Sequence, residues 1–240
     1  KGKFITFEGV DGAGKSTHID AVISFLELQK IEVIRTREPG GTKLGEKLRE
    51  LLLHDEMDPE TETLLMFAAR KQHIAEIIKP ALDKGVFVVS DRFTDATYAY
   101  QYGGKQVSYS KIEALESWVH PELKADLTLL FDLPVEISIE RLKKNRSPDK
   151  FEKEDESFFN RLRNVYLDLA RQNPSRYKII NANQAIESVA QDVIKAKQVF
   201  EASADESIQS IVEQIDDYSH EREQFEALQI EFALLQSRLY

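Results

Sequence analysis

The chain has 240 residues, of which 42% are apolar and 31% are charged, so it is long enough for one large α/β domain with an appendage. This composition excludes fibrous and wholly disordered proteins. No apolar stretch approaches the roughly 18 to 20 residues that a membrane span requires, and residues 1–8 have the pattern of a strand rather than of a signal peptide. The sequence lacks cysteine, which excludes disulfides and thiolate metal sites and is compatible with a reducing compartment. We therefore expect a soluble, cytoplasmic protein.

The net charge of −10 is distributed unevenly along the chain. Residues 198–240 contain ten acidic and two basic residues and carry −8, so residues 1–197 carry only −2. A nearly neutral body offers no positive surface for the phosphates of duplex nucleic acid. Nucleic-acid and membrane partners are therefore not expected, whereas small anionic ligands can still bind where cations gather in one cleft.

Short apolar runs alternate with helical periodicity over the first 197 residues. Five runs have the composition of buried β-strands: 4–7, 32–36, 86–90, 127–131 and 177–180. Strands that alternate with helices form a parallel sheet with helices on both faces. The sequence therefore predicts a doubly wound α/β domain with a five-stranded parallel sheet.

The C-terminal segment, residues 198–240, contains no Gly and no Pro and reads differently from the body. Ser203 and Glu206 form a possible capping box, and apolar residues at 3,4,3 spacing follow. We expect a boundary after residue 197 and an acidic helical extension. Its apolar stripes need a partner. Packing on the body, pairing in a dimer, binding another protein and a remnant of a cloning fusion all stay open.

The first predicted strand is followed by Gly9-x-x-x-x-Gly14-Lys15-Ser16 and then by a helical pattern. This arrangement matches a nucleotide phosphate-binding loop in its required position. Backbone N–H groups of the loop and of the helix N-terminus bind phosphate oxygens, while Lys15 reaches the outer phosphates and the Ser16 hydroxyl can hold Mg²⁺. The predicted nucleotide-binding residues are Gly9, Val10, Asp11, Gly12, Ala13, Gly14, Lys15, Ser16 and Thr17. The alternative is a glycine turn with an incidental lysine.

Asp91 and Arg92 follow the third predicted strand, at the sheet edge where such folds bind ligands. A carboxylate there can orient the water shell of a metal ion, so Asp91 joins Ser16 as a candidate metal residue. Arg92 can bind a phosphate with two parallel hydrogen bonds. The competing interpretation is a surface ion pair at a strand end.

Two further segments are less specific when each is taken alone. Residues 37–42, Arg-Glu-Pro-Gly-Gly-Thr, follow the second strand and have ordinary turn chemistry. Phe67 and Arg70 lie three positions apart on one predicted helix face, so an aromatic ring and a cation could together bind a planar base. A core phenylalanine beside a solvated arginine would give the same pattern.

Taken together, four segments resemble bacterial thymidylate kinases: 7–17, 37–42, 67–70 and 91–101. The resemblance covers about residues 1–197. It implies a nucleoside monophosphate kinase fold with a phosphate-binding loop, and the reaction of ATP with dTMP to give ADP and dTDP. It also implies Mg²⁺ and a cytoplasmic homodimer. The alternatives are a kinase for another nucleotide or nucleoside and a noncatalytic nucleotide-binding regulator.

The resemblance also assigns roles at the acceptor site. It implies that Phe67 stacks on thymine, that Arg70 bonds the base edge, and that Tyr100 crowds the 2′ position of the sugar. By the same resemblance, Arg49 and Arg92 would hold the acceptor phosphate, with Asp11 beside the sugar and phosphate. The remaining acceptor residues implied are Glu38, Pro39, Thr97 and Gln101.

Phosphoryl transfer depends on positive charge around the moving group. We expect Lys15, Mg²⁺ and Arg92 to supply it, with a fourth cation from the lid. Some members of the family carry an arginine in the phosphate loop, but this chain has Gly12-Ala13 there. The predicted lid is residues 143–150, with Arg146 as the catalytic arginine. A solvated basic loop is the competing interpretation.

The lid is also where the sequence departs from the family pattern. Arg146-Ser147 stands for the usual Arg-Gly, and Lys150 stands for the arginine of Asp-Arg-x-Glu. Lysine cannot reproduce the two-pronged contact of a guanidinium, so a catalytic role of Lys150 is in doubt. Arg141, before the lid, is expected to stack on adenine. A further departure at residues 102–105, Tyr-Gly-Gly-Lys, leaves the acceptor-side loop less certain.

Overall fold

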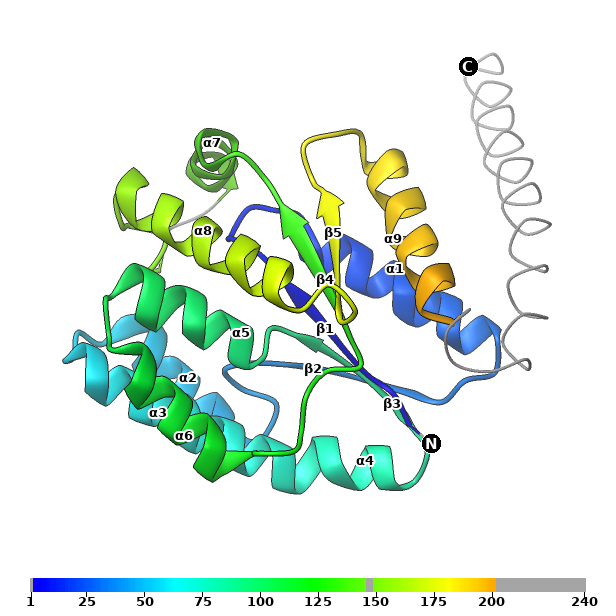
Figure 1. Cartoon of the computed structure of the whole chain (residues 1–240), viewed down its shortest axis with the longest axis horizontal. Helices are drawn as coiled ribbons and strands as arrows, with labels where there is room; N and C mark the ends of the chain where they lie inside the picture. Colours follow the sequence, from blue (N-terminus) through cyan, green and yellow to red (C-terminus); the bar gives the residue numbers. More distant parts are fainter. Residues whose placement is uncertain (1, 146–148, 202–240) are drawn as a thin grey trace, which may run out of the picture. The chain divides into compact units, whose positions relative to one another are not determined.

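The structure, a computed structural model, describes residues 2–145 and 149–201. Its described part is built on one five-stranded sheet in the order β2-β3-β1-β4-β5, and every neighbouring pair of strands is parallel (Figure 1). The strands are β1 (Phe4–Glu8), β2 (Val33–Arg37), β3 (Phe87–Asp91), β4 (Leu127–Asp132) and β5 (Tyr177–Asn181). Because all strands run in one direction, their carboxyl ends meet at a single edge of the sheet.

Helices connect the strands and cover both faces of the sheet (Figure 1). They are α1 (Lys15–Leu28), α2 (Lys43–His54), α3 (Pro59–His73), α4 (Lys79–Asp83), α5 (Thr94–Thr97), α6 (Tyr109–Val119), α7 (Val135–Asn145), α8 (Glu156–Gln172) and α9 (Ile186–Glu201). The π-helical segments η1 (Ile74–Ile78) and η2 (Tyr98–Gly104) continue α3 and α5. Local sequence sets several helix starts. The Asp58 carboxylate, for example, accepts hydrogen bonds from two backbone N–H groups in the first turn of α3, where Pro59 is the first residue.

The predicted five-stranded parallel sheet is confirmed, but each strand ends one residue later than the apolar pattern indicated. The five terminal residues are Glu8, Arg37, Asp91, Asp132 and Asn181. All five are polar, so an apolar run stops one residue before the side chain at the carboxyl end of the strand. The sheet edge formed by these ends is where a ligand would bind.

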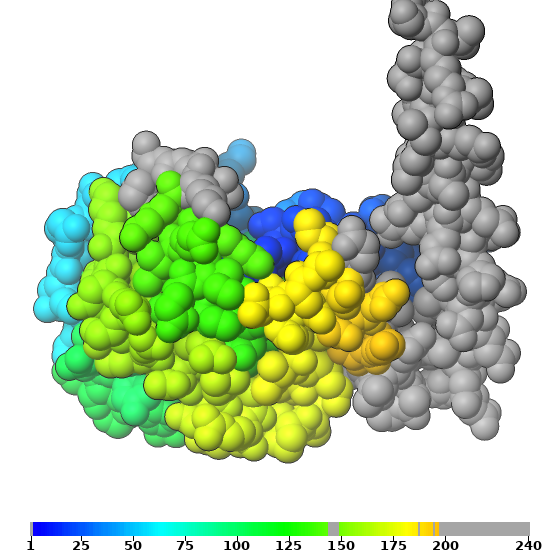
Figure 2. Space-filling view, turned by 90° about the horizontal axis from the view of Figure 1, so that it is seen from above, coloured from blue at the N-terminus to red at the C-terminus, as the bar shows by residue number. Residues whose placement is uncertain are grey.

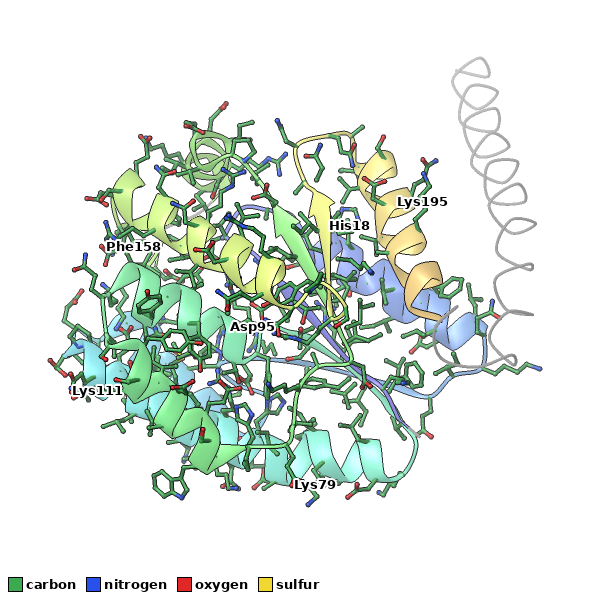
Figure 3. All side chains as sticks on the ribbon, viewed as in Figure 1. His18, Lys79, Asp95, Lys111, Phe158 and Lys195 are labelled. Carbon is green, nitrogen blue, oxygen red and sulfur yellow. The ribbon has the colours of Figure 1, made fainter. Side chains whose placement is uncertain are left out.

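Burial follows the position of each strand in the sheet. All residues of β1 are buried, whereas the edge strands β2 and β5 mix buried with exposed positions. Central strands of a parallel sheet are covered on both faces, which explains their continuous apolar runs. Figure 3 shows this covering, with His18 on α1 and Phe158 on α8 on opposite sides of the sheet.

The chain divides into two compact units, Lys1–Ile194 and Lys195–Tyr240. The first unit contains the whole sheet. Residues 202–240, and with them most of the predicted extension, lie outside the described residues, so the boundary after residue 197 and the helical extension stay predictions. Within residues 2–145 and 149–201, no helix combines the length and the apolar character that crossing a membrane requires.

Two adjacent leucines of α2 offer a test of the core. The Leu52 side chain is fully buried, whereas Leu51 is 44% exposed. We predict that Leu52→Ala lowers the free energy of unfolding by about 2–5 kcal/mol, because it removes buried methyl groups and leaves a cavity. The matched control, Leu51→Ala, should lower it by less than about 1 kcal/mol. Urea unfolding followed by circular dichroism measures both, and equal losses would contradict the assigned packing of α2.

Candidate active site

Two cavities adjoin at the carboxyl edge of the sheet. The large cavity, of about 1190 Å³, is lined by the phosphate loop, by the ends of β2 and β3 and by α7. The small cavity, of about 80 Å³, is lined by residues of α2, α3, α5 and η2. Asp11, Glu38, Arg49 and Arg92 line both cavities, which therefore meet at these four side chains. From above, Figure 2 shows the N-terminal segment (blue) between the green segment that contains α7 and the yellow segment that follows β5.

The phosphate loop forms the floor of the large cavity, between β1 and α1. Gly9 and Gly14 adopt φ angles of 134° and 83°, and a Cβ atom at Gly9 would lie 2.4 Å from the Phe131 carbonyl oxygen. Glycine is therefore required there. The Lys15 ammonium group is buried and donates to the carbonyl oxygens of Gly9 and Val10 at 3.0 Å each. Burial, reinforced by the charge of Arg92, lowers the pKa of Lys15 to about 8, so an anion bound nearby would favour its charged form.

Arg92 lies at the junction of the two cavities in a closed set of polar contacts. Its Nη2 donates to Asp11 Oδ1 at 2.7 Å and to the Tyr100 hydroxyl at 2.9 Å, and Nη1 donates to the Tyr166 hydroxyl at 3.1 Å. The Tyr100 hydroxyl in turn donates to Asp11 Oδ2 at 2.6 Å. Although burial alone would raise it, the charges of Arg92 and Lys15 lower the pKa of Asp11 to about 2. Asp11 is therefore ionised at neutral pH and holds the guanidinium in place.

The backbone of Arg92 is strained. Its φ angle is 70°, in the left-handed region that residues other than glycine rarely adopt, at a cost of about 1–3 kcal/mol. The Arg92 N–H donates to the Phe7 carbonyl at 3.0 Å, and the Ser90 hydroxyl donates to the Arg92 carbonyl at 2.7 Å. These bonds maintain the conformation that directs the side chain to the junction of the cavities.

Glu8 supports the contacts of Arg92 through Tyr166. This role was not predicted from the sequence. The Glu8 carboxyl group accepts hydrogen bonds from the Phe93 N–H at 2.7 Å and from the Tyr166 hydroxyl at 2.9 Å. Burial, reinforced by the charge of Asp95, raises the pKa of Glu8 to about 8. The only signal in the sequence is a carboxylate directly after an apolar strand; its partner Tyr166 lies 158 residues away.

Asp91 and Ser16 are the residues that could hold a metal ion. Both line the large cavity, and the buried Asp91 Oδ1 has no hydrogen-bond partner among the described residues. Carboxylate and hydroxyl oxygens are donors that suit Mg²⁺. In residues 2–145 and 149–201 there is no group of three or more side chains able to ligate a metal by themselves. A cation here would thus need further oxygens from bound phosphates or water.

The small cavity contains a donor without a partner. Arg70 is buried, and its Nε donates to Glu38 Oε2 at 2.7 Å while Nη2 donates to the Thr97 hydroxyl at 2.9 Å. Its Nη1 makes no hydrogen bond within the part of the chain that the structure describes. Glu38 also contacts His73 Nδ1 at 2.9 Å. Although burial alone would raise it, the charge of Arg70 lowers the pKa of Glu38. Arg70 is therefore held firmly, with its Nη1 amino group left for a ligand in this cavity.

Most of the predicted acceptor residues come together around the small cavity. Its walls include Asp11, Glu38, Pro39, Arg49, Arg70, Arg92, Thr97, Tyr100 and Gln101. Phe67 does not line it. That ring is buried, stacks on His120 with centroids 6.4 Å apart, and lies 4.8 Å from the Arg70 guanidinium, while the neighbouring Met66 lines the cavity. The Phe67 ring therefore packs against His120 and Arg70 and is not part of the cavity wall.

The predicted nucleotide side is only partly within the described residues. Arg141, on α7, lines the large cavity and donates to the carbonyl oxygens of Gly12 at 3.2 Å and Ala182 at 3.3 Å. Arg146 lies outside the described residues. Sequence reasoning missed several wall residues of the small cavity: Leu53, Met66, Phe93, Ala96, Asp149 and Phe151. Most are apolar and have the same pattern as core residues, so no local signal distinguishes them.

Three comparisons with known proteins match this chain to the same family. A family model described as thymidylate kinase matches residues 7–193. The thymidylate kinase of Methylobacillus flagellatus is 59% identical over 202 residues, covering 84% of this chain and 100% of the relative. That of Bordetella pertussis is 53% identical over 189 residues, covering 79% of this chain and 91% of the relative. The crystal structure of thymidylate kinase from Ehrlichia chaffeensis superposes with a TM-score of 0.68 at 35% identity, covering 82% of this chain and 99% of the other.

The buried Glu8 predicts a pH dependence of stability. In the folded chain its pKa is about 8, against 4.5 as its ordinary value, so between these values the folded state binds more protons than the unfolded state. Glu8 therefore makes the free energy of unfolding fall as the pH rises, by up to about 1.4 kcal/mol per pH unit. In Glu8→Gln this contribution is absent. As the pH rises from about 5 to about 8, the free energy of unfolding of the wild type should therefore fall relative to that of Glu8→Gln.

Urea unfolding at several pH values measures this difference. The exposed Glu122 provides a control, because Glu122→Gln should run parallel to the wild type at every pH. If the Glu8→Gln curve also runs parallel to the wild type, the assigned protonation of Glu8 is wrong.

Proposed function

The chain belongs to the thymidylate kinase family and transfers a phosphoryl group from ATP to dTMP; we propose that ATP binds in the large cavity and dTMP in the small one. The observation that carries this proposal is the junction of the two cavities at Asp11, Glu38, Arg49 and Arg92. Both ligands end in phosphate, so the donor and acceptor phosphates would meet where two arginines converge. Such convergence places reacting groups in contact before reaction.

The proposed ATP site is the phosphate loop with its helix. Backbone N–H groups at the start of α1 and the Lys15 ammonium would bind the β- and γ-phosphates. Gly9, Gly12 and Gly14 all have positive φ angles, which supports a backbone shaped around an anion. Arg141 lines the same cavity and is proposed to stack on adenine.

The proposed dTMP site follows from one donor that has no partner among the described residues and from two arginines at the junction of the cavities. Arg92 and Arg49 would bind the acceptor phosphate, since both line the junction. Arg70 Nη1 is the group that we propose bonds an acceptor on the base edge. The other proposed contacts are Glu38, Pro39, Thr97 and Gln101, with Phe67 near the base through its packing on Arg70.

A magnesium ion is also proposed. Ser16 and Asp91 would hold it, and Asp91 Oδ1, which has no partner in residues 2–145 and 149–201, fits an oxygen that binds the ion or its water shell. When bound, Mg²⁺ supplies positive charge that neutralises the donor phosphates. The side chains then have to hold the two ligands in line.

Positive side chains are the proposed catalytic groups. An oxygen of the dTMP phosphate attacks the γ-phosphorus of ATP and the bond to the β-phosphate oxygen breaks, so no proton has to move between side chains. Lys15 and Arg92 would stabilise the charge on the transferred group, and Asp11 would keep Arg92 oriented. Arg146, which lies outside the described residues, is proposed as the arginine of the lid.

We further propose that the protein acts as a cytoplasmic homodimer without nucleic-acid or membrane partners. The Trp118 side chain on α6 is 79% exposed and Leu64 on α3 is 55% exposed, and these two helices pack together. We propose that these exposed side chains belong to the contact surface of the dimer. The absence of cysteine and the nearly neutral body agree with the remaining points.

Kinetics of two Tyr100 variants test both the reaction and the proposed acceptor site. Tyr100 is buried and lines the small cavity, where we propose that its ring excludes a 2′-hydroxyl. The wild type should form ADP from ATP and dTMP and should prefer dTMP to the ribonucleotide of thymine. Tyr100→Ala should reduce that preference about tenfold or more, because the space for the hydroxyl opens.

Tyr100→Phe is the matched control. It keeps the ring but loses the hydrogen bonds to Asp11 and Arg92, so it should slow the reaction and retain the sugar preference. A coupled assay of ADP formation with Mg²⁺ measures all three proteins. No ADP formation by the wild type would refute the reaction, whereas an unchanged preference in Tyr100→Ala would refute only the role of Tyr100.

A further inference from the structure

Lys150 closes the predicted lid segment, yet its ammonium group is buried against α2 and α3. Its Nζ lies 2.7 Å from Glu62 Oε2 and donates to the Asp55 carbonyl oxygen at 3.0 Å. The side chains of Lys150 and Glu62 are only 8% and 2% exposed. Lys150 lines neither cavity, although its neighbours Asp149 and Phe151 line the small one. Its charge is therefore directed away from the phosphates.

The position of Lys150 satisfies the end of α2. The last carbonyl groups of a helix lack partners within the helix and carry partial negative charge, which a cation stabilises. The backbone N–H of Lys150 donates to the Leu53 carbonyl oxygen at 3.4 Å. The side-chain Nζ donates to the carbonyl oxygen of Asp55, the residue that caps α2. One residue thus caps α2 with its backbone and with its side chain.

Glu62 connects Lys150 to the acceptor site. While Oε2 contacts Lys150, Oε1 accepts a hydrogen bond from Gln101 Nε2 at 2.9 Å. Gln101 is 1% exposed and lines the small cavity. Removing one partner of a buried ion pair leaves an uncompensated charge, which is strongly destabilising. Loss of the lysine charge would therefore disturb the carboxylate that orients Gln101.

Lys150 also fixes a wall of the small cavity. The Phe151 ring packs edge-on against Tyr100 with centroids 5.6 Å apart, and both rings line the cavity. Asp149 Oδ1 accepts hydrogen bonds from the N–H groups of Phe151 at 2.9 Å and Glu152 at 3.0 Å, which makes the segment a tight turn. Because this turn is anchored through Lys150, the position of Phe151 depends on the contact with Glu62.

We propose that Lys150 is a positioning residue for the acceptor, acting through Glu62 on Gln101 and through the turn on Phe151, and not a cation of phosphoryl transfer. The inference rests on the proposed assignment of dTMP to the small cavity. It accounts for a lysine where the family pattern has an arginine, since a single ammonium group suffices to join one carboxylate oxygen and one carbonyl.

Steady-state kinetics of Lys150→Met test the proposal. The variant keeps an unbranched side chain, one atom shorter, and loses its charge. We expect the KM for dTMP to rise about tenfold or more, with kcat and the KM for ATP changing less than about threefold. The matched control is Lys153→Met, which removes an exposed charge three residues away and should leave all three constants unchanged.

A second variant separates buried charge from charge near the phosphates. Lys150→Met with Glu62→Gln leaves no unpaired charge in the core, so the double variant should recover most of the dTMP affinity that Lys150→Met loses. It should also fold where the single variant does not, which thermal unfolding of each protein monitors. If Lys150 were instead a cation of phosphoryl transfer, Glu62→Gln would add its own loss of activity to that of Lys150→Met.

Three results would overturn the proposal. One is a fall of about a hundredfold or more in kcat of Lys150→Met with an unchanged KM for dTMP, which is typical of a transfer cation. Another is unchanged kinetics in Lys150→Met, and the third is no recovery in the double variant. Failure of the wild type to use dTMP would instead refute the assignment of the acceptor, so the two failures are distinguishable.

Discussion

The ion pair between Arg92 and Asp11, whose side chains are 14% and 26% exposed, is the interaction on which the rest of the site depends. A cation at the carboxyl edge of the sheet is useful for phosphate only if it is held in place and partly desolvated, and burying it is expensive unless it is paired. Asp11 compensates the charge, the Tyr100 and Tyr166 hydroxyls accept two further hydrogen bonds from the Nη atoms, and a strained φ angle directs the side chain. Glu8 then holds Tyr166 by accepting a hydrogen bond from its hydroxyl.

The two ends of the small cavity are held by the same kind of interaction. At the junction with the large cavity, Asp11 orients Arg92. Elsewhere in the small cavity, Gln101 is oriented by Glu62, which does not line the cavity and is itself paired with Lys150. Both carboxylates are ionic partners of a cation and both hold a second polar group. The acceptor site is therefore a rigid frame around a small opening, which suits a ligand recognised by shape and by a few fixed donors.

The fold and the phosphate loop were predictable from the sequence because their signals are local. Apolar runs located the strands, and the spacing of Gly9, Gly14 and Lys15 located the loop. Glu8 could not be found in this way, since its role arises from contacts with Phe93 and Tyr166, far along the chain. Motif reasoning also could not tell that Phe67 packs on His120 and Arg70 and does not line the cavity.

The most direct test of the central claim is the binding of dTMP and thymidine, which differ by the phosphate, to the wild type and to Arg92→Ala by isothermal titration calorimetry. If Arg92 binds the acceptor phosphate, the wild type should prefer dTMP to thymidine by about a hundredfold, on the scale of two hydrogen bonds to a charged group. In Arg92→Ala most of that preference should disappear while the Kd for thymidine stays nearly constant. An undiminished preference in Arg92→Ala would contradict the account.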